Sequence, residues 1–374
     1  MHRIAFSLIG GAHQFLHGVA VLAELSRRAE VEARAYVVSG DDAVSLREML
    51  DRLGAGPVEI VVMALPRPLE TLARKMGFAA AMKVPRLIHW ATHIRRSDAI
   101  VSLERTSTLL KRLPGHCPPM VHIPHGAGDR AKGYEPRFRF FDLVLVAGEK
   151  DRTRLLDTGL LKPDRVAKIG YSKLAALRAL GFESTCDGFS QSRPTVLYIP
   201  HFDRSLSSWD GMGRAIIDRI ARDGRFNLIV APHMRLFEHA VQEGRALCEE
   251  FAGSDNVHID PGSQASLDMT YTMQADLLVS DISSQIYEFC IRPRPCIFVN
   301  AHGVRWEDDP SYAMWRLGDV IEDIEQLIPA IENAFAHPDA YANRQREAVH
   351  WSLGDLEQST DVIASDRILE LLAR

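Results

Sequence analysis

Cysteine is scarce in this chain of 374 residues and is not arranged for any of its usual structural roles. The five cysteines are scattered, odd in number, and lack the close paired spacing of a zinc site or a disulfide scaffold. Long apolar runs are missing too, since no segment approaches the roughly 18 to 20 residues that span a bilayer. We therefore expect a cytoplasmic protein in a reducing compartment, without a membrane-spanning helix.

An excess of positive charge is also absent. The chain has 44 basic and 49 acidic residues, a net charge of -5, so it has no general electrostatic attraction to nucleic acid. The common cofactor and catalytic signatures are missing as well: no Walker loop, GxSxG elbow or HExxH motif occurs, and the early GGAHQFLHG turn lacks three-glycine dinucleotide spacing. We expect chemistry without a metal or cofactor, and an anionic ligand that is bound locally.

What the chain does contain is an ordinary globular composition, with 46% hydrophobic and 25% charged residues, at a length that suits two domains. Its apolar start is interrupted by Gly10, Gly11 and His13, which favours a first strand over a secretion signal. Strand and helix patterns then alternate, which predicts mostly parallel sheets covered by helices. Strands are expected at 4–9, 33–38, 58–63, 86–90, 120–123, 141–147, 165–169, 195–199, 226–230, 257–259, 276–280 and 296–299.

The helices expected between these strands divide the chain into two α/β domains. They lie at about 14–28, 41–53, 69–82, 150–158, 171–180, 209–222, 236–251, 321–336 and 340–372. A polar segment at 182–193 predicts a linker, so the domains are expected at 1–180 and 181–374.

Two polar features of the first domain leave alternatives open. The segment 92–113 predicts a basic amphipathic helix that faces either solvent or an anionic acceptor or lipid headgroups, with peripheral membrane contact in the second case. His13 and His17 are one helical turn apart; a ligand pair is the alternative to a solvated first turn, which we favour.

Candidate site residues follow the predicted strands. In an open parallel sheet the carboxyl ends of the strands share one edge, where ligands bind. His125 and Gly126 follow one strand of the first domain, and a histidine there is suited to accept a proton near neutral pH. In the second domain the polar strand ends are His201-Phe202-Asp203-Arg204, His233-Met234-Arg235 and Asp281-Ile282-Ser283-Ser284.

The last of these segments is a strand-to-helix turn, where unpaired N–H groups and two hydroxyls favour a phosphate. A plain helix cap is the alternative role for Ser283 and Ser284. His233 and Arg235 are candidates for contacts to phosphate oxygens. Glu288 is a candidate acceptor for a ribose or polyol hydroxyl, although we favour an ordinary exposed helical carboxylate.

Three motifs in this order resemble the CDP-glycerol glycerophosphotransferase family, the teichoic-acid polymerases and primases: IPHG at His125, APHMR at His233, and SDISSQIYEF at Asp281. The resemblance covers about 121–300. It implies a GT-B architecture of two Rossmann-like domains with a cleft between them, the last helix returning to the first domain. Where the family has a TWHGTPLK-like segment this chain has HIPHGAGDR, and PHFDR replaces a threonine-tryptophan-arginine segment.

By this resemblance His125 is the catalytic base of the HG motif, His233 contacts the donor phosphates, and Ser283 and Ser284 hold the same diphosphate. Asp281 matches the aspartate before the serines and carries over as a structural member of the site. The other implied site residues are Arg235, Arg204 and Glu288 on the donor side and Gly126 on the acceptor side.

The implied function is a transferase that moves a phosphopolyol from a CDP-linked donor to a hydroxyl of a surface-polymer or lipid-linked acceptor at the inner face of the cell membrane, releasing CMP. One alternative is a GT-B glycosyltransferase or epimerase that uses a UDP-sugar. Another is a nucleotide-binding protein without turnover, which the absence of the family's lysine after the HG glycine suggests.

Overall fold

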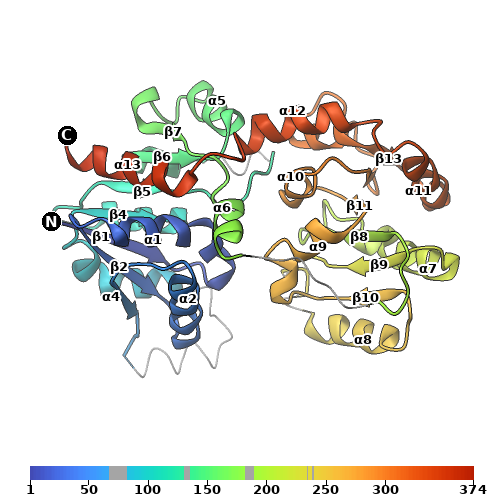
Figure 1. Ribbon diagram of the computed structural model, residues 1–374, viewed down its shortest axis with the longest axis horizontal. Coiled ribbons are helices and arrows are strands. Elements are labelled where there is room, and N and C mark those ends of the chain that lie inside the picture. The colour runs from blue at the N-terminus through green and yellow to red at the C-terminus, as the bar shows by residue number, and fades with distance from the viewer. Residues whose placement is uncertain (67–81, 130–134, 182–188, 234, 238–239) are drawn as a thin grey trace. The chain divides into compact units, whose positions relative to one another are not determined.

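The computed structural model describes residues 1–66, 82–129, 135–181, 189–233, 235–237 and 240–374. The chain forms two compact units (Figure 1). The first consists of Met1–His125, Tyr134–Phe182 and Trp351–Arg374, and the second of Gly126–Gly133 and Glu183–His350. The domain boundaries predicted from the sequence, 1–180 and 181–374, remain a proposal for how the chain folds.

The first unit is built on a seven-stranded sheet in the order β3-β2-β1-β4-β5-β6-β7, in which all neighbouring strands are parallel. The strands are β1 (His2–Leu8), β2 (Val31–Val37), β3 (Val58–Val62), β4 (Ala99–Ser102), β5 (Met120–His122), β6 (Leu143–Val146) and β7 (Val166–Lys168). The order reverses between β1 and β4. Ligands of doubly wound sheets bind at such a reversal, beyond the carboxyl ends of the strands.

Helices cover this sheet: α1 (Val19–Arg27), α2 (Gly40–Arg52), α4 (Lys83–Ile94), α5 (Glu149–Asp157), α6 (Ser172–Ala179) and α13 (Thr360–Leu372). Short 3-10 turns lie between them: η1 (Ala12–His17), η3 (Arg105–Arg112), η5 (Pro136–Phe140) and η6 (Pro163–Arg165). The C-terminal helix α13 packs beside α1 in this unit (Figure 1).

The second unit repeats the arrangement with a six-stranded parallel sheet in the order β10-β9-β8-β11-β12-β13. Its strands are β8 (Thr195–Ile199), β9 (Asn227–Val230), β10 (Val257–Ile259), β11 (Leu277–Ser280), β12 (Cys296–Val299) and β13 (Asp319–Ile321). The order reverses between β8 and β11, so the segments that follow these two strands meet at the reversal.

The helices of the second unit are α7 (Arg214–Asp223), α8 (Val241–Phe251), α9 (Thr270–Gln274), α10 (Gln285–Phe289) and α11 (Leu327–Ala336), and α12 (Ala342–Leu353) precedes the C-terminal segment. A π-helical turn, η7 (Trp209–Gly213), precedes α7, and 3-10 turns form at η8 (Gln264–Ser266), η9 (Pro310–Leu317) and η10 (Ile324–Gln326). In the part of the chain that the structure describes, no helix is both long and apolar enough to span a membrane.

The α/β fold class predicted from the alternating pattern is confirmed. Inner parallel strands of both sheets are buried on their two faces, as strands of this fold class are. In β4, β6, β9, β11 and β12 every residue is buried. At least three of the four residues in each of these strands are apolar, and parallel strands between two helical layers bury such runs fully. The sheet cores therefore follow directly from the composition of these short segments.

Two predicted elements of the first unit come out differently, and a third is not tested. Residues 86–90 belong to helix α4, not to a strand, because Leu87, Ala91 and Ile94 recur with helical spacing and are buried. The helix predicted at 92–113 does not form: this segment holds the end of α4, then β4 and η3. The basic residues Arg105, Lys111 and Arg112 lie on the short 3-10 turn η3 instead of on one long helix. The helix predicted at 69–82 lies almost wholly outside the described residues.

Candidate functional site

In the first unit, polar side chains gather where the strand order reverses. They come from the segments after β1, β4 and β5 and from the start of α4: His13, Gln14, His17, Lys83, Glu104 and His125. The hydrogen bonds and ring contacts among them define one cluster, which we call the β1–β4 cluster.

His125 follows β5, and its ring has a defined tautomer. Nδ1 lies 2.9 Å from the carbonyl oxygen of Leu103. A carbonyl only accepts, so Nδ1 carries the hydrogen and Nε2 of the neutral ring is left as an acceptor. The residue is exposed to solvent. Protein packed around the ring disfavours the charged form and lowers the pKa of His125, against the opposing effects of the Leu103 carbonyl and of Glu104.

Gln14 connects His125 to an ion pair in which Glu104 is buried and Lys83 is half-buried. The Gln14 side-chain nitrogen donates to Glu104 Oε1 at 3.1 Å and lies 3.5 Å from His125 Nε2. The same Glu104 oxygen accepts from Lys83 Nζ at 2.6 Å. Burial raises the pKa of Glu104, but the hydrogen bond and charge of Lys83 outweigh it, so the net shift is downward. Glu104 is therefore a carboxylate at neutral pH.

The favoured solvated first turn at His13 and His17 is wrong. His17 is buried and its Nδ1 has no hydrogen-bond partner among the described residues. Its ring centroid lies 6.3 Å from that of His125 and 5.9 Å from that of Tyr171. Burial, followed by the charge of Lys173, lowers the pKa of His17 well below its ordinary value. Burial likewise lowers the pKa of His13, so both rings are neutral near pH 7.

In the second unit, Asp281 joins the ends of β11 and β8. Its Oδ2 accepts hydrogen bonds from the backbone N–H groups of His201 and Ser208, both at 2.9 Å, and its carbonyl oxygen accepts from Trp315 Nε1 at 2.6 Å. Its other carboxylate oxygen, Oδ1, is buried without a partner among the described residues. Burial raises the pKa of Asp281 to about 6, although these donors favour the charged form. These contacts agree with a structural role.

The ring of Phe202 contacts two imidazole rings and a guanidinium group at the ends of β8 and β9. Its ring lies 4.4 Å from that of His201 and 4.7 Å from that of His233, measured between centroids. The guanidinium carbon of Arg235 lies 4.3 Å from the Phe202 centroid, a cation–π distance. His233 and Arg235 are both exposed. Two of the predicted donor-binding side chains are thus neighbours, at an accessible edge of the sheet.

The serine turn after β11 is present, although the helix that it starts is short. Helix α10 has five residues, and the Gln285 backbone N–H donates to Ser283 Oγ at 3.2 Å. The N-cap residue of α10 is Ser284, and its side chain makes no capping hydrogen bond, so the contact of Ser283 is that of the residue before the cap. Ser284 lies against Gly126, where an added Cβ would be 3.1 Å from Ser284 Oγ. Gly126 has a φ of 79°, a conformation that side chains disfavour.

Glu288 does not take the exposed position that we favoured for it. It is buried in α10 with 2% of its surface exposed. In the same short helix, Tyr287 donates its hydroxyl hydrogen to Asp129 Oδ2 at 2.7 Å, and both residues are buried. Glu288 therefore faces the protein interior of this region, and its proposed contact to a ligand hydroxyl stays a prediction.

Arg204 is engaged in surface ion pairs. It contacts the carboxylates of Asp210 and Glu243, the latter at 3.5 Å, and about half of its side chain is exposed. Glu243 also accepts from Trp209 Nε1 at 3.0 Å. Its predicted contact to donor phosphates would require Arg204 to leave these partners.

Gln14, Lys83, Glu104 and Phe202 were not predicted as site residues. Glu104 follows β4, and that strand was hidden inside a predicted helix, so nothing marked Glu104 as a strand-end residue. Phe202 was visible beside His201, but an aromatic side chain next to a histidine gives no chemical signal by sequence alone. Its role appears only when β8 and β9 pair and bring His233 to it.

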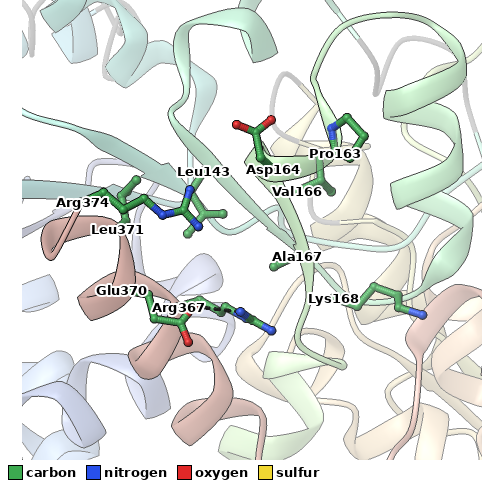
Figure 2. A pocket seen from close by; sticks show the side chains of 10 residues that line it. All are labelled: Leu143, Pro163, Asp164, Val166, Ala167, Lys168, Arg367, Glu370, Leu371 and Arg374. Atoms are coloured by element: carbon green, nitrogen blue, oxygen red, sulfur yellow. Dashed lines mark hydrogen bonds and ion pairs between the residues drawn. The ribbon is translucent and has the colours of Figure 1, made fainter.

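A cavity of about 380 Å³ lies elsewhere in the first unit, between β6, β7 and α13 (Figure 2). Its lining includes Arg367, Glu370 and Arg374 from the C-terminal helical segment and Asp164 and Lys168 from the neighbourhood of β7. None of the predicted site residues lines it. Among the described residues no group of three or more His, Cys, Asp or Glu is arranged to hold a metal ion.

Comparison with known proteins relates the chain to solved structures only. No protein-family model and no curated protein matches the sequence. The S. aureus MnaA structure with UDP has a TM-score of 0.65 at 11% identity, covering 100% of this chain and 98% of that chain. The UDP-GlcNAc 2-epimerase of Methanocaldococcus jannaschii with UDP-GlcNAc and UDP has a TM-score of 0.64 at 13% identity, covering 98% and 99%.

The wall teichoic acid polymerase TagF, soaked with CDP-glycerol, is similar to the same degree. Its TM-score is 0.64 at 14% identity, and the match covers 100% of this chain and 88% of that chain. At such low identities the similarity establishes the fold alone. The chain therefore has the GT-B fold of two Rossmann-like parallel-sheet domains.

Proposed function

We propose that the protein is a transferase that moves a phosphopolyol from a CDP-linked donor to a hydroxyl group of an acceptor and releases CMP. The observation that carries the proposal is the state of His125, whose Nδ1 is bonded to the Leu103 carbonyl and whose Nε2 is left to accept a proton. The lowered pKa keeps the ring neutral near pH 7, as a general base requires.

The reaction balances with His125 as the base. The acceptor hydroxyl gives its proton to Nε2 while its oxygen bonds to the β-phosphorus of the donor. The bond between that phosphorus and the bridging oxygen breaks, and CMP leaves with the electron pair. Positioned base catalysis of this kind contributes roughly 10² to 10⁴ in rate.

On the donor side we assign the phosphates to His233, Arg235 and the serine pair. What supports this is that Phe202 holds the exposed imidazole and guanidinium together, and that both groups suit phosphate oxygens. Gly126 lies against Ser284 within the second unit. Following the family resemblance, we propose that His125 and Ser284 act on the same donor.

The test is nucleotide release with purified protein. We expect CDP-glycerol to raise the melting temperature and to yield CMP when an acceptor polyol or polymer is added. His125→Ala should lower turnover by about 10² or more, the share assigned to the base. His116→Ala, which removes an exposed histidine outside the site, is the matched control. Unchanged CMP release by His125→Ala would contradict the assignment of the base.

A second candidate has equal support from the fold: conversion of a UDP-sugar, by an epimerase or a glycosyltransferase. The MnaA structure cited above contains UDP, and the cited UDP-GlcNAc 2-epimerase contains UDP-GlcNAc and UDP. The same thermal-shift panel separates the candidates. Stabilisation by UDP-GlcNAc and UDP without any effect of CDP-glycerol would favour the UDP-sugar reaction, and NMR of the sugar ring would then distinguish epimerisation from transfer.

The acceptor class and the cellular setting are also proposals. A polymer or lipid-linked hydroxyl acceptor follows from the family resemblance, as does work at the inner face of a membrane. The long helix expected at 92–113 does not form, so of that segment only the short basic turn η3 is left as a candidate for membrane contact. If CDP-linked donors bind tightly and no product forms with any acceptor, the chain is a nucleotide-binding protein without turnover.

A further inference from the structure

Gln14 is buried beside the candidate base although it belongs to none of the motifs that suggested a function. It lies in η1, directly after the first strand, with 4% of its surface exposed. Its amide stands over Gly10, where an added Cβ would be 1.8 Å from Gln14 Oε1. The side chain is thus packed against glycine backbone on one side and faces Glu104 and His125 on the other.

Glu104 decides which end of the Gln14 amide faces His125. A carboxylate accepts only, so the atom 3.1 Å from Glu104 Oε1 has to be the amide nitrogen. Lys83 Nζ at 2.6 Å and Thr106 Oγ1 at 3.3 Å hold the carboxylate in place. The second amide hydrogen is then available to His125 Nε2, 3.5 Å away. Gln14 Oε1 is left buried without a partner among the described residues, a cost that the structure tolerates.

We propose that Gln14 is a positioning residue for His125: held by Glu104, its amide N–H₂ faces Nε2 and keeps that nitrogen in the unprotonated, proton-accepting form. The inference rests on the proposed function for its catalytic meaning. At 3.5 Å the contact is long for a hydrogen bond, so the single lone pair of Nε2 remains available to the proton of the acceptor hydroxyl. The amide acts through its polarity, because a donor opposite Nε2 disfavours the tautomer that carries its hydrogen on Nε2.

Other charged and titratable groups face His125 and act on the same ring. Glu104 raises the pKa of His125, and Arg105 and Lys83 lower it. The rings of His13, His17 and His122 are also close enough to interact with it electrostatically. Any test therefore has to change Gln14 alone and measure His125 directly.

Two nearly isosteric variants reverse or remove the polarity. Gln14→Glu replaces the donor by a carboxylate, which prefers Nε2–H; we expect the pKa of His125 to rise by about 1 to 3 units, the range for a neighbouring opposite charge. Gln14→Met removes the amide and should move the pKa by less. The measurement is the ¹⁵N and ¹H NMR titration of the His125 ring, with melting temperatures as the check on folding.

Activity gives the second readout. If the protein transfers phosphopolyol, the acid limb of its pH–rate profile should move upward with the pKa in Gln14→Glu, and KM for the donor should stay the same. Gln14→Met should lower kcat by only about 2-fold, the lower end of what a hydrogen bond contributes, because the contact is long. Because NMR needs no turnover, an inactive wild-type protein with the expected titration shifts would sink the transferase proposal alone.

The opposite outcome overturns the positioning role. If folded Gln14→Glu and Gln14→Met both leave the ring nitrogens and the pKa of His125 as in the wild-type protein, Gln14 only fills space over Gly10. A kcat loss without any change in the titration would have the same meaning, since packing defects reduce turnover without altering a tautomer.

Discussion

The close approach of Gly126 to Ser284 makes Gly126→Ala the most direct test of the geometry next to the candidate base. The glycine has a φ of 79°, and an added Cβ would lie 3.1 Å from Ser284 Oγ and 3.4 Å from Ser284 Cβ. A side chain in this left-handed conformation costs about 1 to 2 kcal/mol. The contact adds to it, because Ser284 has to shift by a few tenths of an ångström.

We therefore expect Gly126→Ala to lower the free energy of unfolding of the second unit by at least about 1 to 2 kcal/mol, and the melting temperature by at least about 2 to 8 °C for a unit of this size. Urea unfolding followed by fluorescence gives the first number and calorimetry the second. Gly128→Ala is the matched control. Its Cβ would be 4.0 Å from Ser284 Cβ, an ordinary van der Waals distance, and its φ is not positive.

The double variant Gly126→Ala with Ser284→Ala separates the two causes. Removing the hydroxyl relieves the contact but not the backbone conformation, so the double variant should recover only part of the lost stability. Donor binding should fall in Gly126→Ala because Ser284 moves. If Gly126→Ala unfolds like Gly128→Ala and binds nucleotide like the wild-type protein, the reasoning about this turn is refuted.

Two further predictions concern the second unit. Burial raises the pKa of Asp281 to about 6 in the folded protein, whereas its pKa in the unfolded chain is about 4. The free energy of unfolding should therefore fall by about 3 kcal/mol as the pH rises from about 4 through about 6, because the folded state then has to lose the proton from a buried carboxyl group. In Asp281→Asn the unfolding free energy should fall less between pH 4 and pH 7, and parallel urea-derived curves would contradict this. Phe202→Ala should weaken donor binding by about 2- to 5-fold, because it removes one exposed cation–π contact to Arg235. If titration calorimetry finds an unchanged Kd for the donor, Phe202 does not position Arg235 for binding.

Much of the fold could be predicted because parallel strands carry their own signal. Buried runs such as 196–199 and 296–299 are apolar throughout and stand between helical patterns, and they form most of β8 and all of β12, as expected. Where the signal is weaker, the prediction failed. In β4 three apolar residues precede a serine and lie between polar segments with helical spacing, and β13 has only three residues.

Some residues of the candidate site could be predicted from the sequence, and others could not. His125, His233, Arg235, Asp281 and the serine pair were visible because polar residues at the carboxyl ends of parallel strands share one edge. The residues that contact them could not be predicted. Glu104 could not be recognised as a strand-end residue because β4 was not predicted. The orientation of the Gln14 amide depends on Glu104, because an amide has no preferred orientation until a charged neighbour selects it.

The amino-acid sequence by itself thus determined the fold class, the alternation of strands and helices, and which chemically active residues stand at strand ends. These properties depend on neighbours in the chain. Only the tertiary structure decided that His17 and Glu288 are buried, that Asp281 bonds the backbone of His201, and that Gln14 faces the base. Burial and hydrogen-bond partners depend on residues 80 or more positions apart, as in the Asp281–His201 and Gln14–Glu104 contacts, and no local pattern encodes them.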